Sequence, residues 1–371
     1  MARVLLTNFH VGPGGGHTTY IEALTKISNN SSHVIGVAVA ERSRLYRRLK
    51  ADSYPYLYAC DFPGRALKNP LKFIKSVRRF RNVVSDFKPD IVHSNGGSDL
   101  FISLWSHPYS GKYKIIRTHH ASRSIRKDPY HWHVFRHLTD ANIYVSTSSF
   151  EMGTSRSIIP RNAVIIENGV DLDKFSPTPK NLALAREYDI DADTFCFGTS
   201  GGTKTYKRVD TIIRAVALIQ SERKFKILVL GGISPELQEL ADKLGVGQFV
   251  CCGFQENVIP HISLFDVGFI LSDRIETISF AAREMMSMGK PIISSSYSGL
   301  KENVLNGING FLVQPGNIHE IAASMTKFLE MDNMTLRKFS ENARQYAIDH
   351  FDIKKQLEAH ASLYNEIMKL E

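Results

Sequence analysis

Short apolar runs alternate with helical stretches along most of the chain, and this alternation restricts the possible fold more than any other feature. Each run has the length and composition of a strand that is buried on both faces of a parallel sheet. Parallel strands need crossover connections, and these place helices on both faces of a sheet. The sequence therefore predicts an α/β fold, with strands at residues 4–9, 33–40, 91–94, 114–120 and 142–146, and again at 195–200, 226–232, 249–254, 267–272 and 292–296.

The length and composition suit a soluble protein of two domains. The chain has 371 residues, of which 43% are hydrophobic and 22% charged, enough for two cores of ordinary size. No apolar run approaches the ~20 residues of a membrane span, and the N-terminus lacks the layout of a signal peptide. Its four cysteines have no metal-type or redox-type spacing. A cytoplasmic protein is expected.

The formal net charge of +9 favours an anionic partner. Much of the basic surplus lies in the first ninety residues, including Lys68 and a helix predicted at residues 70–87. The basic side chains of this helix form either a solvated face or a surface attracted to anionic lipid, at roughly 1 kcal/mol per Lys or Arg. Nucleic acid is disfavoured, because no binding module is present. The apolar positions expected to share one face are Leu71, Ile74, Val77, Phe80 or Val84, and Phe87.

In the first domain, candidate ligand-binding residues follow predicted strands. A glycine-rich loop at residues 12–16, which includes Gly15 and Gly16, separates the first strand from a helix. Strand, glycine loop and helix in this order form the phosphate-approach pattern of doubly wound folds. Since ligands of such sheets bind beyond the carboxyl ends of strands, His93, His119 and His120 are expected to meet a substrate. Each histidine could equally be a core-edge residue.

In the second domain, the stretch 273–291 carries the strongest candidate site. Glu276 and Glu284 flank a helix predicted at residues 279–288, which Gly289 and Pro291 end. The helix N-terminus offers unpaired amides and a positive dipole end to an anion such as a diphosphate. Glu284 could then accept hydrogen bonds from a ribose diol, and Glu276 from a neighbouring sugar. Two solvated glutamates beside an ordinary helix remain the alternative.

These residues resemble the E-x7-E segment of family 4 retaining glycosyltransferases of the GT-B type. The usual form is close to E-x-F-G-x-x-x-x-E-A-M-A-x-G-x-P-V, from which Ile278 and Ser279 depart. The resemblance covers nearly the whole chain. The other segments that resemble the family are the loop ending in Lys207, the tract at 163–171 continued by Phe175 and Pro177, and the tracts at 298–302 and 306–313.

The resemblance implies two Rossmann-like domains that face a cleft. Residues 1–175 would form the acceptor-side domain and residues 176–350 the nucleotide-sugar domain. Residues 351–371 would form a helix that crosses back to the N-terminal domain.

The resemblance also implies roles for single residues. Lys207 would bind the donor diphosphate, Glu276 the donor sugar and Glu284 the ribose, while His120 would line the active site. The clamp arginine of the family is replaced by Gly202 or its neighbour, so that Lys204 or Arg208 would supply the second positive charge. The groups expected near the phosphates are Gly15, Gly16 and the amides of Ser279 and Phe280.

The expected activity is transfer of a sugar, with retention, from a nucleotide-sugar, with UDP favoured, to a saccharide or lipid-linked acceptor. The proposed context is bacterial surface-polysaccharide or lipopolysaccharide assembly by a peripheral enzyme at an anionic membrane surface. No metal and no cofactor besides the nucleotide-sugar co-substrate is expected. Two alternatives stay open: a nucleotide-sugar 2-epimerase of the same fold, and a basic membrane-binding protein without catalysis.

Overall fold

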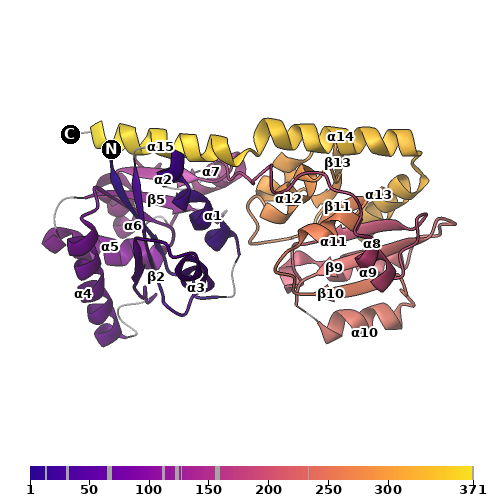
Figure 1. Ribbon diagram of the computed structural model, residues 1–371, viewed down its shortest axis with the longest axis horizontal. Helices are drawn as coiled ribbons and strands as arrows, with labels where there is room; N and C mark the ends of the chain where they lie inside the picture. The colour runs from indigo at the N-terminus through magenta and orange to yellow at the C-terminus, as the bar shows by residue number, and fades with distance from the viewer. Residues whose placement is uncertain are drawn as a thin grey trace. The chain divides into compact units, whose positions relative to one another are not determined.

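A computed structural model describes residues 1–12, 15–30, 33–64, 69–110, 113–121, 125–126, 128–154, 159–232 and 234–369. Positions 13 and 14 of the glycine-rich loop, and Lys68, lie outside these ranges. The chain divides into two compact units (Figure 1). Unit 1 comprises Met1–Asn168 together with Lys354–Glu371, and unit 2 comprises Gly169–Ile353. The first division falls seven residues before the expected boundary at 175/176, inside the Asn168-Gly169 turn pair.

Unit 1 is built on a seven-stranded parallel sheet with the order β3-β2-β1-β4-β5-β6-β7. The order reverses between β1 and β4, which is the arrangement of a doubly wound sheet. The central strands β1, β4 and β6 are almost fully buried, as expected when helices cover both faces. The strands are β1 Arg3–Asn8, β2 Val34–Val39, β3 Leu57–Ala59, β4 Ile91–Ser94, β5 Lys114–His119, β6 Ala141–Tyr144 and β7 Ala163–Ile165.

The helices of unit 1 include the last helix of the chain. Tyr364 of this helix bonds His93, and His360 bonds Tyr20 at 2.7 Å, so the helix closes the core of unit 1 (Figure 1). The helices are α1 Gly16–Thr25, α2 Ile27–Asn30, α3 Arg44–Ala51, α4 Pro70–Phe87, α5 Gly97–Ser110, α6 Pro129–His133, the π-helical η2 Val134–Leu138, α7 Thr147–Thr154 and α15 Ile353–Lys369.

Unit 2 repeats the same design with a six-stranded parallel sheet of order β10-β9-β8-β11-β12-β13. Its strands are β8 Phe195–Thr199, β9 Phe225–Leu230, β10 Phe249–Gly253, β11 Val267–Ile270, β12 Ile292–Ser295 and β13 Gly310–Val313. Its helices are α8 Leu182–Glu187, the 3-10 turn η3 Thr205–Lys207, α9 Val209–Val216, α10 Pro235–Lys243, α11 Ile259–Leu264, α12 Phe280–Ser287, the 3-10 helix η4 Ser298–Asn303, α13 Ile318–Glu330 and α14 Asn333–His350. The predicted α/β class with two doubly wound sheets is confirmed.

Two glycines of the sequence tracts have a clear packing role. At Gly169, an added Cβ would lie 2.4 Å from Ile353 Cα, because Val170 pairs with the backbone on either side of Asp352. At Gly310, an added Cβ would lie 2.1 Å from Ile292 O in the neighbouring strand. Real Cβ atoms do not approach so closely, so both backbones need glycine.

The expected apolar face of α4 is wrong at its N-terminal end. Leu71 is 80% exposed and Ile74 47% exposed. The helix instead buries Phe73, Ser76, Val77, Phe80, Val83, Val84 and Phe87. A helix advances about 100° per residue, so the face centred on Phe73 and Phe80 leaves Leu71 and Ile74 on its outer side.

Within the described ranges, no helix has both the length and the apolar character needed to cross a membrane.

Candidate functional site

The topology of unit 2 brings two sequence-predicted residues together. Its strand order reverses between β8 and β11, and ligands of doubly wound sheets bind beyond the carboxyl ends of strands at such a reversal. Lys207 follows β8, at the end of η3, and Glu276 follows β11. The two side chains therefore meet at the edge where a ligand of this fold is expected.

Lys207 and Glu276 form an ion pair through Lys207 Nζ and Glu276 Oε2, and each side chain is only 14% exposed. Ser272 Oγ donates a second hydrogen bond to the same carboxylate oxygen, at 3.0 Å. The Lys207 ammonium also lies 5.3 Å from the centre of the Tyr206 ring. The lysine is thus held at the strand ends by a partner of opposite charge.

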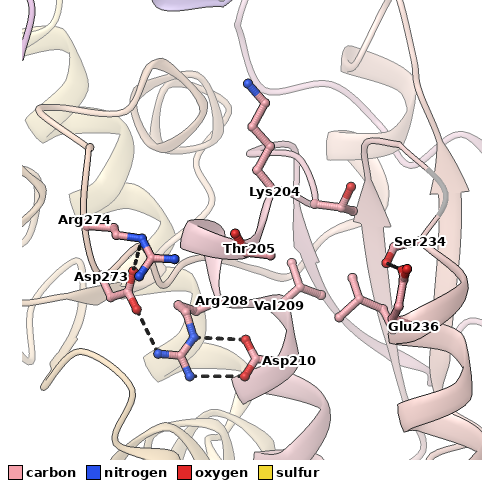
Figure 2. Close-up of a pocket in the computed structure, with 11 residues that line it drawn as sticks. Lys204, Thr205, Arg208, Val209, Asp210, Ser234, Glu236, Asp273 and Arg274 are labelled. Carbon is pink, nitrogen blue, oxygen red and sulfur yellow. Dashed lines mark hydrogen bonds and ion pairs between the residues drawn. The ribbon is translucent and has the colours of Figure 1, made fainter.

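Arg208 is held by two carboxylates of its own unit. Its Nε and Nη2 donate to the two oxygens of Asp210 at 3.0 and 3.1 Å, and its Nη1 donates to Asp273 Oδ2 at 2.9 Å (Figure 2). The hydrogen bonds to Asp210 and Asp273 raise the pKa of the Arg208 guanidinium. With these donors engaged, the geometry does not favour Arg208 as the replacement for the missing clamp arginine.

The backbone of Arg208 is in an unusual conformation. Arg208 has φ +53°, in the left-handed region, which costs an L-residue roughly 1–2 kcal/mol. The bonds to Asp210 and Asp273 anchor this conformation at the junction between η3 and α9.

Lys204 has an exposed side chain that extends away from the Arg208 cluster (Figure 2). The structure records no ion pair for its ammonium among the described side chains. Beside it lies a cavity of about 560 Å³, which Lys207, Glu276 and Glu284 do not line. The cavity is lined by Thr203, Lys204, Thr205, Arg208, Val209, Asp210, Ser234, Glu236, Leu237, Asp273 and Arg274.

Helix α12 begins as the sequence predicts, at Ser279. Ser279 Oγ accepts a hydrogen bond from the Ala282 amide, at 3.4 Å. The amides that precede Ala282 in the first turn of the helix therefore remain directed out of the helix N-terminus. Ser279 has φ +53° and the neighbouring Ile275 has φ +61°. Positive φ at a β-branched residue is a genuine outlier, and such strain is concentrated at ligand sites.

Replacing Ser279 tests the two opposing effects at this cap. Ser279→Ala is expected to lower the free energy of unfolding by about 1 kcal/mol, because it removes the capping oxygen and keeps the strained backbone. Ser279→Gly is expected to be neutral or slightly stabilising, because glycine adopts positive φ without cost. Urea unfolding of both variants measures the difference. Equal losses in both would show that the left-handed backbone carries no strain.

Glu284 lies one turn after Phe280, on the same face of α12. Burial raises the pKa of its carboxyl from an ordinary 4.5 to about 7, while Lys174 acts in the opposite direction. The structure records no hydrogen bond or ion pair of this carboxylate with the described residues. Glu284 is therefore a partly buried acceptor without a partner in its own unit, as a ribose-binding carboxylate would be.

Two supporting residues were not predicted from the sequence. Arg283 is fully buried and its Nε donates to Asn303 Oδ1 at 3.1 Å. Asn303 Nδ2 in turn donates to Ile278 O at 2.7 Å, which fixes the strained loop before α12. One feature of the sequence could have indicated the supporting role of Arg283. This arginine stands between the core residues Ala282 and Met285, on the inner side of a short amphipathic helix.

In unit 1, the structure places the three candidate histidines in different environments. His93 is fully buried, with Nδ1 at 2.8 Å from the Tyr364 hydroxyl and Nε2 at 2.6 Å from Thr118 Oγ1. The expectation that His93 meets a substrate is therefore wrong, because both ring nitrogens are used inside the core. His119 stacks on Tyr144 with ring centres 4.6 Å apart, and burial lowers its pKa to about 3.

His120 is partly exposed at the end of β5. Asn95 Nδ2 donates to the carbonyls of Thr7 and His93, which leaves Asn95 Oδ1 to accept from His120 Nε2 at 2.9 Å. The Nε2–H tautomer follows. Burial holds the pKa of His120 well below its ordinary value, with His17 and Arg117 acting in the same direction. His120 is thus a neutral imidazole at the carboxyl edge of this sheet.

Gly15 and Gly16 lie at the start of α1, also in unit 1. Gly15 is the N-cap, has φ +139° and provides no side-chain cap. Burial lowers the pKa of the adjacent His17 to about 4, and its ring centre lies 4.2 Å from that of His120. An uncapped helix start and two neutral histidines thus share the carboxyl edge of this sheet. The approach of Gly15 and Gly16 to a phosphate stays a prediction.

No group of three or more histidine, cysteine, aspartate or glutamate side chains arranged to hold a metal ion occurs among the described residues.

Two family models match the chain, one in each half. The model described as Glycosyltransferase Family 4 matches residues 13–174, and the model described as Glycosyl transferases group 1 matches residues 183–346. N-acetyl-alpha-D-glucosaminyl L-malate synthase of Bacillus anthracis is 25% identical over 190 residues, which are 50% of this chain and 49% of that protein. The chain spans about half the length of the curated relatives it matches.

Solved structures match over the full length. A glycosyltransferase from Rickettsia africae has a TM-score of 0.87 at 19% identity, covering 100% of this chain and 99% of that one. HepE from Anabaena, solved with UDP and glucose, has a TM-score of 0.82 at 17% identity, covering 98% of this chain and 100% of that one. At these identities the likeness concerns the fold.

Proposed function

Since the chain belongs to the family 4 glycosyltransferases of the GT-B type, we propose that it transfers a sugar from a nucleotide-sugar to a saccharide or lipid-linked acceptor. The observation that carries the proposal is the pairing of Lys207 with Glu276 at the strand-order reversal of unit 2. A cation for a diphosphate and a carboxylate for a sugar lie there in contact. The capped start of α12 follows within the next eight residues, as does Glu284, whose carboxylate has no recorded partner among the described residues.

The donor is proposed to enter by exchange of partners. The diphosphate of the donor replaces Glu276 as the ion-pair partner of Lys207 and binds the outward amides at the α12 N-terminus. Glu276, no longer paired with Lys207, then accepts hydrogen bonds from the donor sugar. Glu284 accepts from the ribose hydroxyls. The exposed Lys204 is the better candidate for the second positive charge, because Arg208 is already paired with Asp210 and Asp273. HepE was solved with UDP and glucose, which supports a UDP-sugar as the first donor to test.

The chemical step needs stabilisation of the negative charge that develops on the leaving diphosphate, which Lys207 and the helix amides supply. Retention of configuration is proposed to follow a front-face route, in which the leaving phosphate oxygen takes the proton of the acceptor hydroxyl as the new glycosidic bond forms. This route requires no protein nucleophile and no metal ion. Neutral His120 would line the active site, as the family resemblance implies.

The acceptor is proposed to be a saccharide or lipid-linked saccharide of bacterial surface-polysaccharide or lipopolysaccharide assembly, reached at the cytoplasmic face of the membrane. The support is the net charge of +9 and the basic surplus of unit 1, which attract anionic surfaces.

The test is thermal unfolding of the full chain with UDP-, GDP-, ADP- and TDP-sugars, repeated on Lys207→Ala and Glu284→Ala. A ligand at ~100 times its Kd adds roughly 2.7 kcal/mol to the free energy of unfolding, a shift that is easily measured. We expect stabilisation by one class of nucleotide-sugar, lost in both variants. Lack of stabilisation by any donor would count against the enzyme and favour a basic binding protein.

The same donor then separates transfer from epimerisation. Incubation without acceptor is expected to leave the donor sugar unchanged. Release of free UDP together with an altered sugar in the absence of any acceptor would identify a 2-epimerase.

A further inference from the structure

An apolar and basic surface lies on the outer side of α4 and α5 in unit 1, far in sequence from the donor residues. Leu71, Ile74 and Trp105 are exposed to 80%, 47% and 54%, and Tyr130 at the start of α6 to 50%. Lys75 and Arg78 are exposed on the same helix α4. We call this set of six residues the α4–α5 face.

Contacts show that the α4–α5 face is continuous. Helices α4 and α5 pack side by side (Figure 1), and Arg81 Nη2 donates to Trp105 O at 3.2 Å. Ile74 precedes Arg81 by seven residues, or two turns, so it lies on the same side of α4. Arg78 and Leu71 follow within about 60° around the helix.

Aromatic rings extend this surface to α6. The Trp105 ring lies 5.9 Å from Phe73 and 6.0 Å from Phe101, and Phe101 lies 6.3 Å from Tyr130. The partly exposed rings of Trp105 and Tyr130 therefore pack against the buried ring of Phe73 and the partly buried ring of Phe101. The whole α4–α5 face belongs to unit 1, so its geometry is independent of unit 2.

Helix α4, which supplies Lys75 and Arg78 to the α4–α5 face, is strongly positively charged. Helix α4 carries Lys72, Lys75, Arg78, Arg79 and Arg81 against one carboxylate, Asp86, which accepts from the Tyr58 hydroxyl. The acidic residue of α5, Asp99, is fully buried. The structure records no ion pair for Lys72, Lys75 or Arg78 with the described side chains. These cations are available to a partner.

We infer that the α4–α5 face docks on an anionic lipid bilayer. Tryptophan and tyrosine favour the headgroup level of a membrane, aliphatic side chains beside them enter the acyl boundary, and unpaired lysine and arginine are attracted to anionic headgroups. Docking deepens the proposed function, because it brings unit 1 to a surface that holds lipid-linked acceptors. Docking is measured without donor or acceptor. Docking can therefore be absent while transferase activity is present, and transferase activity can be absent while docking is present.

The two tryptophans of the chain, Trp105 and Trp132, provide a built-in comparison. Trp132 follows Tyr130 by two residues, which turns it about 200° around α6, and its ring contacts His137 with centres 4.9 Å apart. It is exposed but lies outside the α4–α5 face. Trp132→Phe leaves Trp105 as the fluorescent reporter, and Trp105→Phe leaves Trp132.

The experiment mixes the full chain with vesicles of phosphatidylcholine alone, or of phosphatidylcholine and phosphatidylglycerol in equal parts, at low salt. We expect cosedimentation with the mixed vesicles only, weakened by added salt. Trp105 emission is expected to shift to the blue and to be quenched by brominated lipid, with a much smaller response from Trp132.

Two surface variants and one control complete the test. Lys75→Gln with Arg78→Gln is expected to weaken partitioning about 25-fold, at about fivefold per charge, and Leu71→Gln with Ile74→Gln is expected to abolish the Trp105 shift. The control, Leu218→Gln with Lys243→Gln, changes an exposed apolar and an exposed basic residue of unit 2 and is expected to bind vesicles normally. Absence of vesicle binding, equal losses in the control, or an unshifted Trp105 would overturn the inference. A concentration-dependent dimer lost in the Leu71 and Ile74 variant would instead assign the α4–α5 face to a second copy of the chain.

Discussion

Replacing Lys207 with alanine is expected to lower kcat/KM for sugar transfer by about 10²–10³-fold, the loss typical when one preorganised stabiliser of developing negative charge is removed. The physical reason is its position at the ends of β8 and β11, where its ammonium now contacts Glu276. Steady-state kinetics with the donor found by thermal unfolding measure the effect. Stabilisation by the nucleotide-sugar should fall in parallel.

A second variant separates this catalytic loss from a loss of stability. Lys207→Ala leaves Glu276 partly buried, with Ser272 as its remaining hydrogen-bond donor, so the variant should also unfold at lower temperature. The double variant Lys207→Ala with Glu276→Gln removes the unpaired charge and should recover much of the unfolding temperature but none of the activity. Lys204→Ala is the comparison variant for stability, because it leaves the Lys207–Glu276 pair intact. Near-normal kcat/KM in Lys207→Ala would contradict the assignment.

Donor affinity is expected to fall about tenfold between pH 8 and pH 6, because the ionised fraction of a carboxyl with a pKa of about 7 falls by that factor over this range. Only the ionised Glu284 accepts hydrogen bonds from both ribose hydroxyls. Titration of the nucleoside diphosphate at several pH values measures the effect, with Glu284→Gln as the control. The variant should bind weakly and show little of this pH dependence. An unchanged slope in the variant would assign the titration to another group.

The same pKa has an opposite consequence for the stability of the free protein. The carboxyl titrates at 4.5 in an ordinary environment and at about 7 in the folded chain, so the folded state binds more protons between these values. The free energy of unfolding contributed by Glu284 therefore falls as the pH rises through this window. Glu284→Gln should unfold at a higher temperature than the parent at pH 8, with the difference shrinking toward pH 4.5.

The strands and helices of the site could be predicted from local patterns. The apolar runs of β8 and β11 and the Ser279 start of α12 depend on the identity of neighbouring residues, so the predicted bounds agree with the structure to within two residues. The outward position of Leu71 and Ile74 could not be predicted in this way. Both residues fit an apolar stripe on α4, but the layer of α5 decides which side is covered.

The partners of charged residues depended on the fold. Arg208 and Lys204 are equivalent candidates as sequence, yet Asp273 is brought to Arg208 from the loop after β11, 65 positions later, which leaves Lys204 exposed. His93 and His120 both end strand-like segments, but Tyr364 of the last helix bonds His93 inside the core. Contacts between distant segments carry no local signal, since they arise when parallel strands align their carboxyl ends.

By itself, the sequence determined the α/β class and the position of the candidate donor segment, because hydrophobic periodicity and helix capping act over a few residues, while the two doubly wound sheets were implied by the family resemblance. The tertiary structure decided that Lys207 contacts Glu276 and that the charged Arg208 is already paired with carboxylates. It further decided that Arg283 and Asn303 support the strained loop. It also decided which apolar residues of α4 stay outside the core. These outcomes depend on burial and on contacts between segments far apart in the chain, which no local pattern encodes.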